Sequence, residues 1–77
     1  MKNLALYILS QLTDKPEEVD VAENHDEMGN VTLTLKVARE DMGKIIGKEG
    51  KTIRAIRDVI KILAIKENKY VNVILAE

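Results

Sequence analysis

The chain contains no cysteine, tryptophan or phenylalanine, and it has only one proline and two tyrosines. Without cysteine there are no disulfides, thiol nucleophiles or thiolate metal sites. With so few aromatic rings, a surface that binds its ligand mainly by ring stacking is not expected. The longest apolar run covers residues 4–9, well short of the roughly 20 residues that cross a bilayer. No basic leader with a cleavage site precedes that run, so we expect a cytoplasmic protein with no membrane partner.

The length of 77 residues is enough for one small domain and too short for two lobes around a catalytic cleft. A composition of 45% hydrophobic and 32% charged residues is typical of a folded chain. No nucleophile with a neighbouring base stands out, so neither an enzyme nor a bound cofactor is expected. The sole histidine, His25, lies in a polar turn with scattered acids and is better explained as solvated surface than as a metal ligand.

The formal net charge of −1 conceals a strong separation of charge along the chain. Residues 1–30 carry seven acids against two lysines, whereas residues 31–66 carry nine basic residues against four acids. The basic excess surrounds two glycines, Gly47 and Gly50. Such a local positive region favours a polyanionic partner even though the net charge is near zero.

The pattern of apolar residues predicts an α+β chain in the order helix, strand, strand, helix, Gly-x-x-Gly, helix, strand. The predicted helices cover residues 3–12, 42–46 and 51–66, and the predicted strands cover residues 17–23, 31–38 and 70–75. The first two strands are expected to form an antiparallel hairpin, and the last strand, after a crossover helix, to lie parallel to a neighbour. Three helices then cover one face of a three-stranded mixed sheet.

The two glycines lie in a tight connection between the second and third predicted helices. Glycine tolerates a positive φ and has no Cβ, so the backbone here can approach an anion closely, and the N-terminus of the next helix favours negative charge. The sequence Gly50-Lys51-Thr52 also matches the end of a Walker A loop. That motif requires a glycine where this chain has Ile45, and a strand before the loop, so nucleotide hydrolysis is not expected.

The octapeptide at residues 46–53, Ile-Gly-Lys-Glu-Gly-Lys-Thr-Ile, resembles the signature of KH domains, in which a Gly-x-x-Gly loop joins two helices. The element order resembles the type II KH arrangement of a single domain at 1–77, with residues 2–24 as the N-terminal extension and a core at about 30–77. The run Val37–Gly50 is similar to the small single-domain bacterial proteins of the KhpA family. Arg39 is a departure, since a proline is expected there in many relatives.

The resemblance implies that the partner is single-stranded RNA, clamped through about four nucleotides, and it leaves single-stranded DNA open. The residues implied in the clamp are Lys44, Ile46, Gly47, Lys48, Glu49, Gly50, Lys51 and Arg54. Lys36 and Arg57 would extend the basic track, and Val37 or Ile45 would add apolar surface for bases. Glu49 opposes the attraction of phosphate. The resemblance further implies an RNA chaperone or post-transcriptional regulator of low sequence specificity, with links to cell wall growth and cell shape.

The glycines themselves offer a test of the clamp. Gly47→Asp and Gly50→Asp are each expected to abolish RNA binding while leaving the fold intact, because each adds a negative side chain where the RNA backbone would approach.

Two alternatives stay open beside the RNA clamp. In the first, the glycines make a plain turn between helices and the lysines are a solvated face. The second arises because the apolar arc of the last helix is broad, with these residues at 180° to 340° from Ile53: Ala55, Ile56, Val59, Ile60, Ile62 and Leu63. Either the core covers this arc, or part of it is a subunit interface. The resemblance implies a homodimer and pairing with a larger KH-containing RNA-binding protein, so the alternative function is an interaction module.

Overall fold

Helix α1 (Lys2–Leu12) opens the chain, and its buried side chains, Ala5 and Leu9, face the sheet. The chain leaves the helix at Thr13, which is extended. Lys15 is kept out of the helical region by the proline that follows it, and a 3-10 turn, η1 (Pro16–Glu18), begins at that proline. The computed structural model describes residues 1–76, so Glu77 of the expected domain lies outside the described residues.

The sheet contains three strands in the order of the chain: β1 (Asp20–His25), β2 (Val31–Lys36) and β3 (Val71–Leu75). β1 pairs antiparallel with β2, and β2 pairs parallel with β3, which confirms the predicted hairpin and mixed sheet. The predicted bounds of the first strand, 17–23, are wrong because its first residues form η1. There the N–H of Val19 donates to the carbonyl of Pro16 at 3.1 Å and does not join a sheet ladder. The second strand also ends earlier than predicted, at Lys36.

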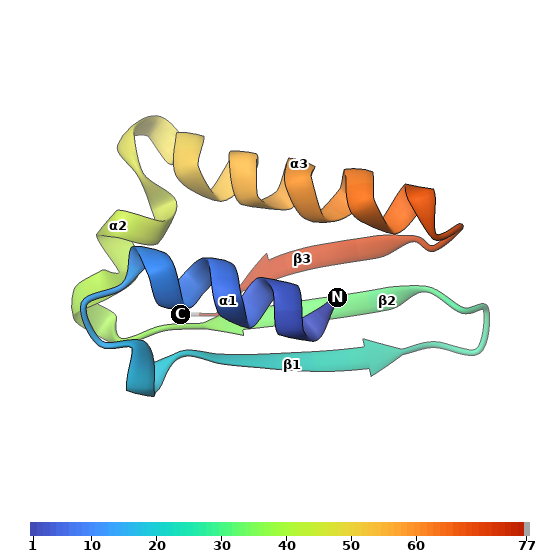
Figure 1. The fold of residues 1–77 in the computed structure, drawn as a ribbon, viewed down its shortest axis with the longest axis horizontal. Helices are drawn as coiled ribbons and strands as arrows, with labels where there is room; N and C mark the ends of the chain where they lie inside the picture. Colours follow the sequence, from blue (N-terminus) through green and yellow to red (C-terminus); the bar gives the residue numbers. More distant parts are fainter. Residues whose placement is uncertain (77) are drawn as a thin grey trace.

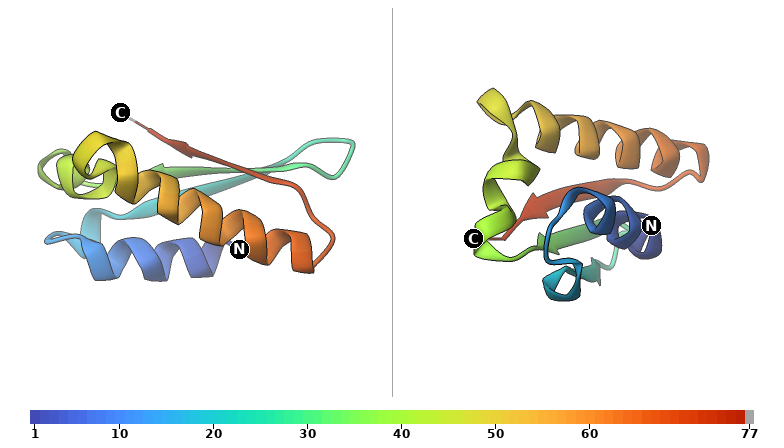
Figure 2. Two further views of the ribbon diagram at one scale, coloured as in Figure 1. Left: turned by 90° about the horizontal axis from the view of Figure 1, so that it is seen from above. Right: turned by 60° about the vertical axis from the view of Figure 1, so that its left-hand side comes forward.

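Alternation along the strands builds the core on one face of the sheet. Val31, Leu33 and Leu35 of β2 are buried beneath the helices. Their partners in the neighbouring strands, such as Val21 opposite Leu35 and Val73 opposite Leu33, are buried as well. Burial of each such side chain is worth about 1.5–3 kcal/mol. Figure 2 shows that the helices gather on this face and leave the other face of the sheet uncovered.

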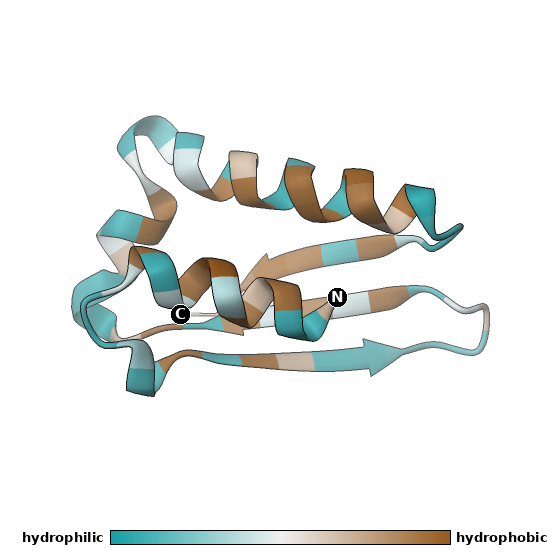
Figure 3. Cartoon of the chain, in the orientation of Figure 1, coloured by the Kyte–Doolittle hydropathy of each residue, from teal (hydrophilic) through white to brown (hydrophobic). Residues whose placement is uncertain are grey.

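Two further helices connect β2 to β3, each after a 3-10 turn: η2 (Arg39–Asp41), α2 (Met42–Ile46), η3 (Lys48–Gly50) and α3 (Lys51–Lys66). The residues that α3 buries recur at helical spacing: Ile53, Ile56, Ile60 and Ala64. Its broad apolar arc is only partly covered, since Val59 is 46% exposed and Ile62 is 57% exposed. Apolar residues recur along the whole of α3 in Figure 3. The exposed fractions show that the core covers one part of the arc and that solvent faces another.

The two ends of α3 lie at opposite ends of the molecule (Figure 1). The turn η3 projects beyond the sheet at one end, and the α3–β3 connection lies at the other, on the same side as the β1–β2 turn. The 16 residues of α3 separate these ends by about 24 Å at 1.5 Å per residue. Within residues 1–76, no helix combines the length and the apolar character needed to cross a membrane.

Candidate nucleic-acid interface

The loop between α2 and α3 is built from backbone conformations that are rare outside glycine. Gly47 has φ 74° and ψ 175°, and Gly50 has φ 74° and ψ 16°. Glu49, between them, is also left-handed, with φ 56° and ψ 26°. These conformations reverse the chain within η3, so that α3 begins at Lys51, directly after the loop. The N–H groups and the positive end of the α3 dipole therefore meet the loop, which favours an anion there.

The two glycines differ in what they tolerate. A Cβ on Gly47 would overlap the side chain of Thr52, lying 2.7 Å from its Cβ and 2.9 Å from its backbone nitrogen. The φ, ψ combination of Gly47 is also essentially restricted to glycine. At Gly50 the nearest atoms belong to the far end of Arg54, 4.0 Å away, so the left-handed φ is the main obstacle. The expectation that Gly47→Asp leaves the fold intact is therefore wrong, whereas Gly50→Asp remains a usable probe.

The lysines around the loop fall into two groups. Lys48 and Lys51 are exposed, and neither forms an ion pair with a described residue. Lys44, in contrast, pairs with Asp14, which follows α1 in the chain. Lys48 and Lys51 are available to an incoming anion, whereas Lys44 must first break its ion pair with Asp14.

Arg54 bends back over the loop that precedes it. Its Nε donates to the carbonyl of Gly50 at 3.2 Å, and its Nη2 donates to the carbonyl of Glu49. These bonds tie the first turn of α3 to the left-handed residues and stiffen the loop. The side chain of Glu49 is exposed and bonds to no described residue, so its charge lies in solvent beside the lysines.

Ile46 is the apolar side chain next to the loop, and it is 39% exposed. Ile45 is fully buried and Val37 is 7% exposed, so both belong to the core. Consecutive residues on a helix are about 100° apart. Because α2 turns Ile45 toward the sheet, Ile46 must turn outward. The prediction that Ile45 offers surface to bases is therefore wrong. Val37 exposes only a small area, in a hollow that none of the residues 46–51 lines.

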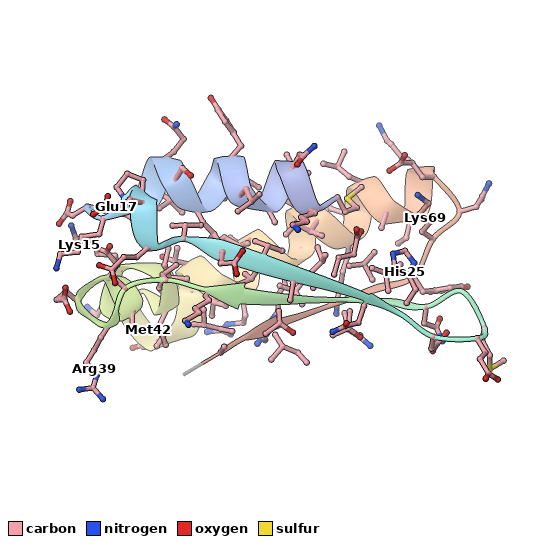
Figure 4. The ribbon with its side chains drawn as sticks, turned by 90° about the horizontal axis from the view of Figure 1, so that it is seen from below. Lys15, Glu17, His25, Arg39, Met42 and Lys69 are labelled. Carbon is pink, nitrogen blue, oxygen red and sulfur yellow. The ribbon has the colours of Figure 1, made fainter. Side chains whose placement is uncertain are left out.

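The other basic residues expected near the loop are divided by the structure. Lys36 lines a separate hollow of about 460 Å³ with Arg39 and Met42, and Figure 4 labels the last two at this end of the sheet. Arg57 follows Arg54 by one helical turn on the same side of α3. It is half-buried, and its Nε is buried without a hydrogen-bond partner. The basic residues therefore continue along α3 through Arg57, whereas Lys36 lines a hollow to which neither the loop nor α3 contributes a residue.

A buried carboxylate positions α2 in a way that the sequence did not predict. Asp41 is 1% exposed and accepts hydrogen bonds from the backbone N–H groups of Asp14 and Lys15, each at 3.0 Å. These bonds, with the one from Asp14 as the largest cause, lower the pKa of Asp41 from its usual range. Lys15 also pairs with Glu40, which raises the pKa of Lys15 and lowers that of Glu40. An acid directly before a helix ordinarily caps that helix, so nothing local pointed to these distant partners.

Histidine and acid side chains do not converge in the described part of the chain. His25 lies on β1 with its Nε2 3.8 Å from Oε2 of Glu23. Among residues 1–76, no three histidine, aspartate or glutamate side chains gather into a group that could hold a metal ion. The chemistry of the loop is that of backbone amides, lysine and arginine.

A family model described as KhpA/KhpB, KH domain matches residues 2–75 of the chain. The chain belongs to the KhpA/KhpB KH-domain family. Two similar proteins, each named RNA-binding protein KhpA, come from Clostridium perfringens and Chlamydia trachomatis. The first is 54% identical over 71 residues, which cover 92% of this chain and 93% of the relative. The second is 43% identical over 77 residues, which cover 100% of this chain and 97% of the relative.

No solved structure gives a significant match to the chain. The match to the KhpA/KhpB model spans α1 through β3 and includes the whole loop. It confirms the resemblance drawn from the Gly-x-x-Gly segment. The α+β architecture of a KH domain, with its mixed sheet and helices on one face, is confirmed as well.

Proposed function

We propose that this protein binds single-stranded RNA through the loop Gly47–Gly50. The observation that carries the proposal is a loop at the N-terminus of α3 whose two glycines have positive φ. Its neighbouring lysines, Lys48 and Lys51, form no ion pair with the described residues. The naming of similar proteins as RNA-binding supports it.

In this proposal the RNA backbone lies against the loop. One phosphate faces the loop amides and the start of α3, where the helix dipole favours it. Lys48 and Lys51 neutralise neighbouring phosphates, and Ile46 offers a small apolar surface to a base. Contacts to phosphate position the strand but carry no sequence information. Low sequence specificity follows. The resemblance to the KhpA family, and not the loop geometry, leads us to propose a role as an RNA chaperone or post-transcriptional regulator in the cytoplasm that influences cell wall growth and cell shape.

A salt titration tests the clamp. For single strands, the slope of log affinity against log salt is about 0.7 per phosphate contact. The double variant Lys48→Gln, Lys51→Gln removes two contacts and is expected to lower the slope by about 1.4. The matched control, Lys2→Gln with Lys66→Gln, removes the same charge from exposed positions outside the loop. Both variants are titrated with a strand of about four nucleotides, which fills the loop alone. An equal change of slope in both variants, or no binding by the wild type at low salt, would refute the proposal.

A second proposal, that the protein self-associates, rests on the uncovered part of the α3 arc. Ala55, Val59 and Ile62 recur at intervals of four and three residues and are all exposed. We propose that a second copy of the chain covers this apolar stripe, with a larger KH-containing RNA-binding protein as the other occupant. A symmetric pair would present two copies of the loop.

The oligomeric state tests this second proposal. Ile62→Asp places a charge in the stripe, and sedimentation is expected to show a dimer for the wild type and a monomer for the variant. Ile74→Asp is the matched control, because Ile74 is 50% exposed on β3 and lies outside the stripe. A wild type that stays monomeric alone and dimerises only with the larger protein would assign the stripe to that partner.

A further inference from the structure

The far end of α3 adjoins a tyrosine whose side chain contributes little to the fold. Tyr70 directly precedes β3 and is 77% exposed. Its backbone carbonyl accepts the N–H of Val31 at 2.9 Å, so the backbone holds the residue in place while the side chain stays in solvent. An exposed aromatic ring can stack on a nucleobase whatever the base is, because every base has a π-face.

The surface around this tyrosine is hollowed and basic. Two adjoining hollows, of about 280 and 190 Å³, share Ile65, Lys69 and Tyr70. Lys61 and Asn72 also line the second one. Neither lysine forms an ion pair with a described residue. Figure 4 labels Lys69 at the end of the molecule opposite to Lys15 and Arg39. The ring thus shares an open hollow with two cations.

A line of cations joins this hollow to the loop. Arg54, Arg57 and Lys61 recur at intervals of three and four residues along one side of α3. Arg57 lies midway along this line and is half-buried, with its Nε buried and without a hydrogen-bond partner. Residues 54–69 hold five basic residues against two acids, Asp58 and Glu67. The formal net charge of residues 54–69 is therefore +3.

We propose that Tyr70, Lys61 and Lys69 form a second contact for single-stranded RNA, in which a base stacks on the tyrosine ring and the lysines bind the flanking phosphates. The proposal rests on the proposed function, since it extends the strand that the loop holds. A single tyrosine agrees with the scarcity of aromatic residues, because the loop remains the main contact and the ring adds to it.

The length of α3 sets the RNA length that reaches both contacts. About 24 Å separates the two ends of the helix, which corresponds to about seven nucleotides at the 3.4 Å spacing of a stacked strand. An oligonucleotide of about four nucleotides fills a KH loop and does not extend to Tyr70. An oligonucleotide of about twelve nucleotides spans both the loop and the hollow.

Binding of oligoadenylates of these two lengths tests the second contact. Tyr70→Ala is expected to weaken binding of the longer strand by about fivefold or more, as the loss of one stacked base implies, and to leave the shorter strand unchanged. Tyr70→Phe keeps the ring and is expected to restore the affinity. Tyr7→Ala is the matched control, since Tyr7 is the other tyrosine, 65% exposed on α1.

Tyrosine fluorescence gives a readout that a structural role would not change. The chain has no tryptophan and two tyrosines, so in a Tyr7→Phe protein the emission comes from Tyr70 alone. Saturation with the longer strand is expected to quench it, and saturation with the shorter strand is not.

Equal affinities of Tyr70→Ala and Tyr7→Ala for the longer strand, or unchanged emission at saturation, would overturn the second contact. If the shorter strand still binds and Gly50→Asp abolishes that binding, the loop proposal survives this failure. If the wild type binds neither strand, both proposals fail.

Discussion

Gly47 and Gly50 share a positive φ, but their neighbours differ. Alanine at Gly50 costs the strain of a left-handed residue, about 1–2 kcal/mol. Alanine at Gly47 is expected to cost clearly more, because its Cβ would press on the side chain and backbone of Thr52. Urea denaturation measures both losses. Gly43→Ala is the control, since no atom lies within 4 Å of a Cβ there and a helical Gly-to-Ala change stabilises by up to about 1 kcal/mol. Equal losses at Gly47 and Gly50 would contradict this account of the loop.

The pair between Lys44 and Asp14 predicts a variant that binds RNA more tightly than the wild type. Asp14→Asn leaves Lys44 free for phosphate and removes a negative charge near the loop. Exposed ion pairs are worth about 0.2–1 kcal/mol, so the gain is expected to be about two- to fivefold in affinity at low salt. Fluorescence anisotropy with a labelled oligonucleotide measures it.

Glu27→Gln is the control for the Asp14 variant, because it makes the same change of net charge at the β1–β2 turn. An equal gain in both variants would show that net charge matters and that the state of Lys44 does not.

At this scale the sequence predicted what depends on neighbours along the chain. The spacing of Gly47 and Gly50 is a local pattern, and their positive φ values confirm the turn expected there. Which cations are free depends on distant residues, because Asp14 lies 30 positions before Lys44. Asp41 is the same case, since its hydrogen-bond partners lie in another segment. A pattern of residue types along the chain does not contain these pairings.

Among the elements, α2 is held to the segment after α1 by the hydrogen bonds that Asp41 accepts from the N–H groups of Asp14 and Lys15. These bonds predict that the stability of the fold depends on pH. The pKa of Asp41 is lowered in the folded state, so the carboxylate stabilises the fold above its ordinary pKa of about 3.9. That stabilisation disappears as the pH falls through the lower, folded-state pKa. Glu40, with its pKa lowered by Lys15, acts in the same direction. Asp41→Asn is therefore expected to lower the Tm at pH 7, and the gap to the wild type is expected to narrow below about pH 4.

Thermal unfolding followed by circular dichroism across this pH range checks the role of Asp41. Asp58→Asn is the control, since Asp58 is exposed on α3 and forms no ion pair with a described residue. It is expected to change the Tm little at neutral pH. A difference in Tm between Asp41→Asn and the wild type that stays constant from pH 7 to pH 3 would show that the charge of the carboxylate does not contribute to this stabilisation.

The elements themselves were largely predictable, because apolar periodicity records which face each one buries. Alternation found β2, and the three- and four-residue spacing found α3, whose start at Lys51 and end at Lys66 are confirmed. The start of β1 was missed because alternation around Val19 and Val21 continues into η1, where backbone bonds replace the ladder. The broad arc of α3 shows a second limit. Periodicity marks apolar positions, but the area of the sheet decides how many of them a small fold can cover.

At the scale of the whole molecule, charge and shape divide the chain in the same way. The acidic residues of the N-terminal part lie after α1, in η1, in β1 and in the segments beside them, while most of the basic residues cluster on α2, η3 and α3. The loop precedes α3 and the hollow at Tyr70 follows it. At about 100° per residue, the stripe with Ile62 lies on a different side of α3 from the basic residues Arg54 and Lys61. In the proposals above, one helix therefore presents a basic side to RNA and an apolar side to a second copy.

This arrangement predicts that assembly and RNA length act together. A dimer carries two loops, and a strand long enough to reach both gains from a high effective concentration, by up to about 10²–10⁴-fold. Ile62→Asp is therefore expected to weaken binding of a long strand by at least about tenfold and to leave an oligonucleotide of about four nucleotides unaffected. Ile74→Asp, the matched control, is expected to change neither. Anisotropy titrations measure the affinity, and sedimentation of the same samples measures the oligomeric state.

Tyr70→Ala in the Ile62→Asp background separates the two sources of length dependence, because base stacking on Tyr70 acts within one chain and avidity requires two chains. A monomeric Ile62→Asp protein that binds the long strand as tightly as the wild type would rule out cooperation between two loops.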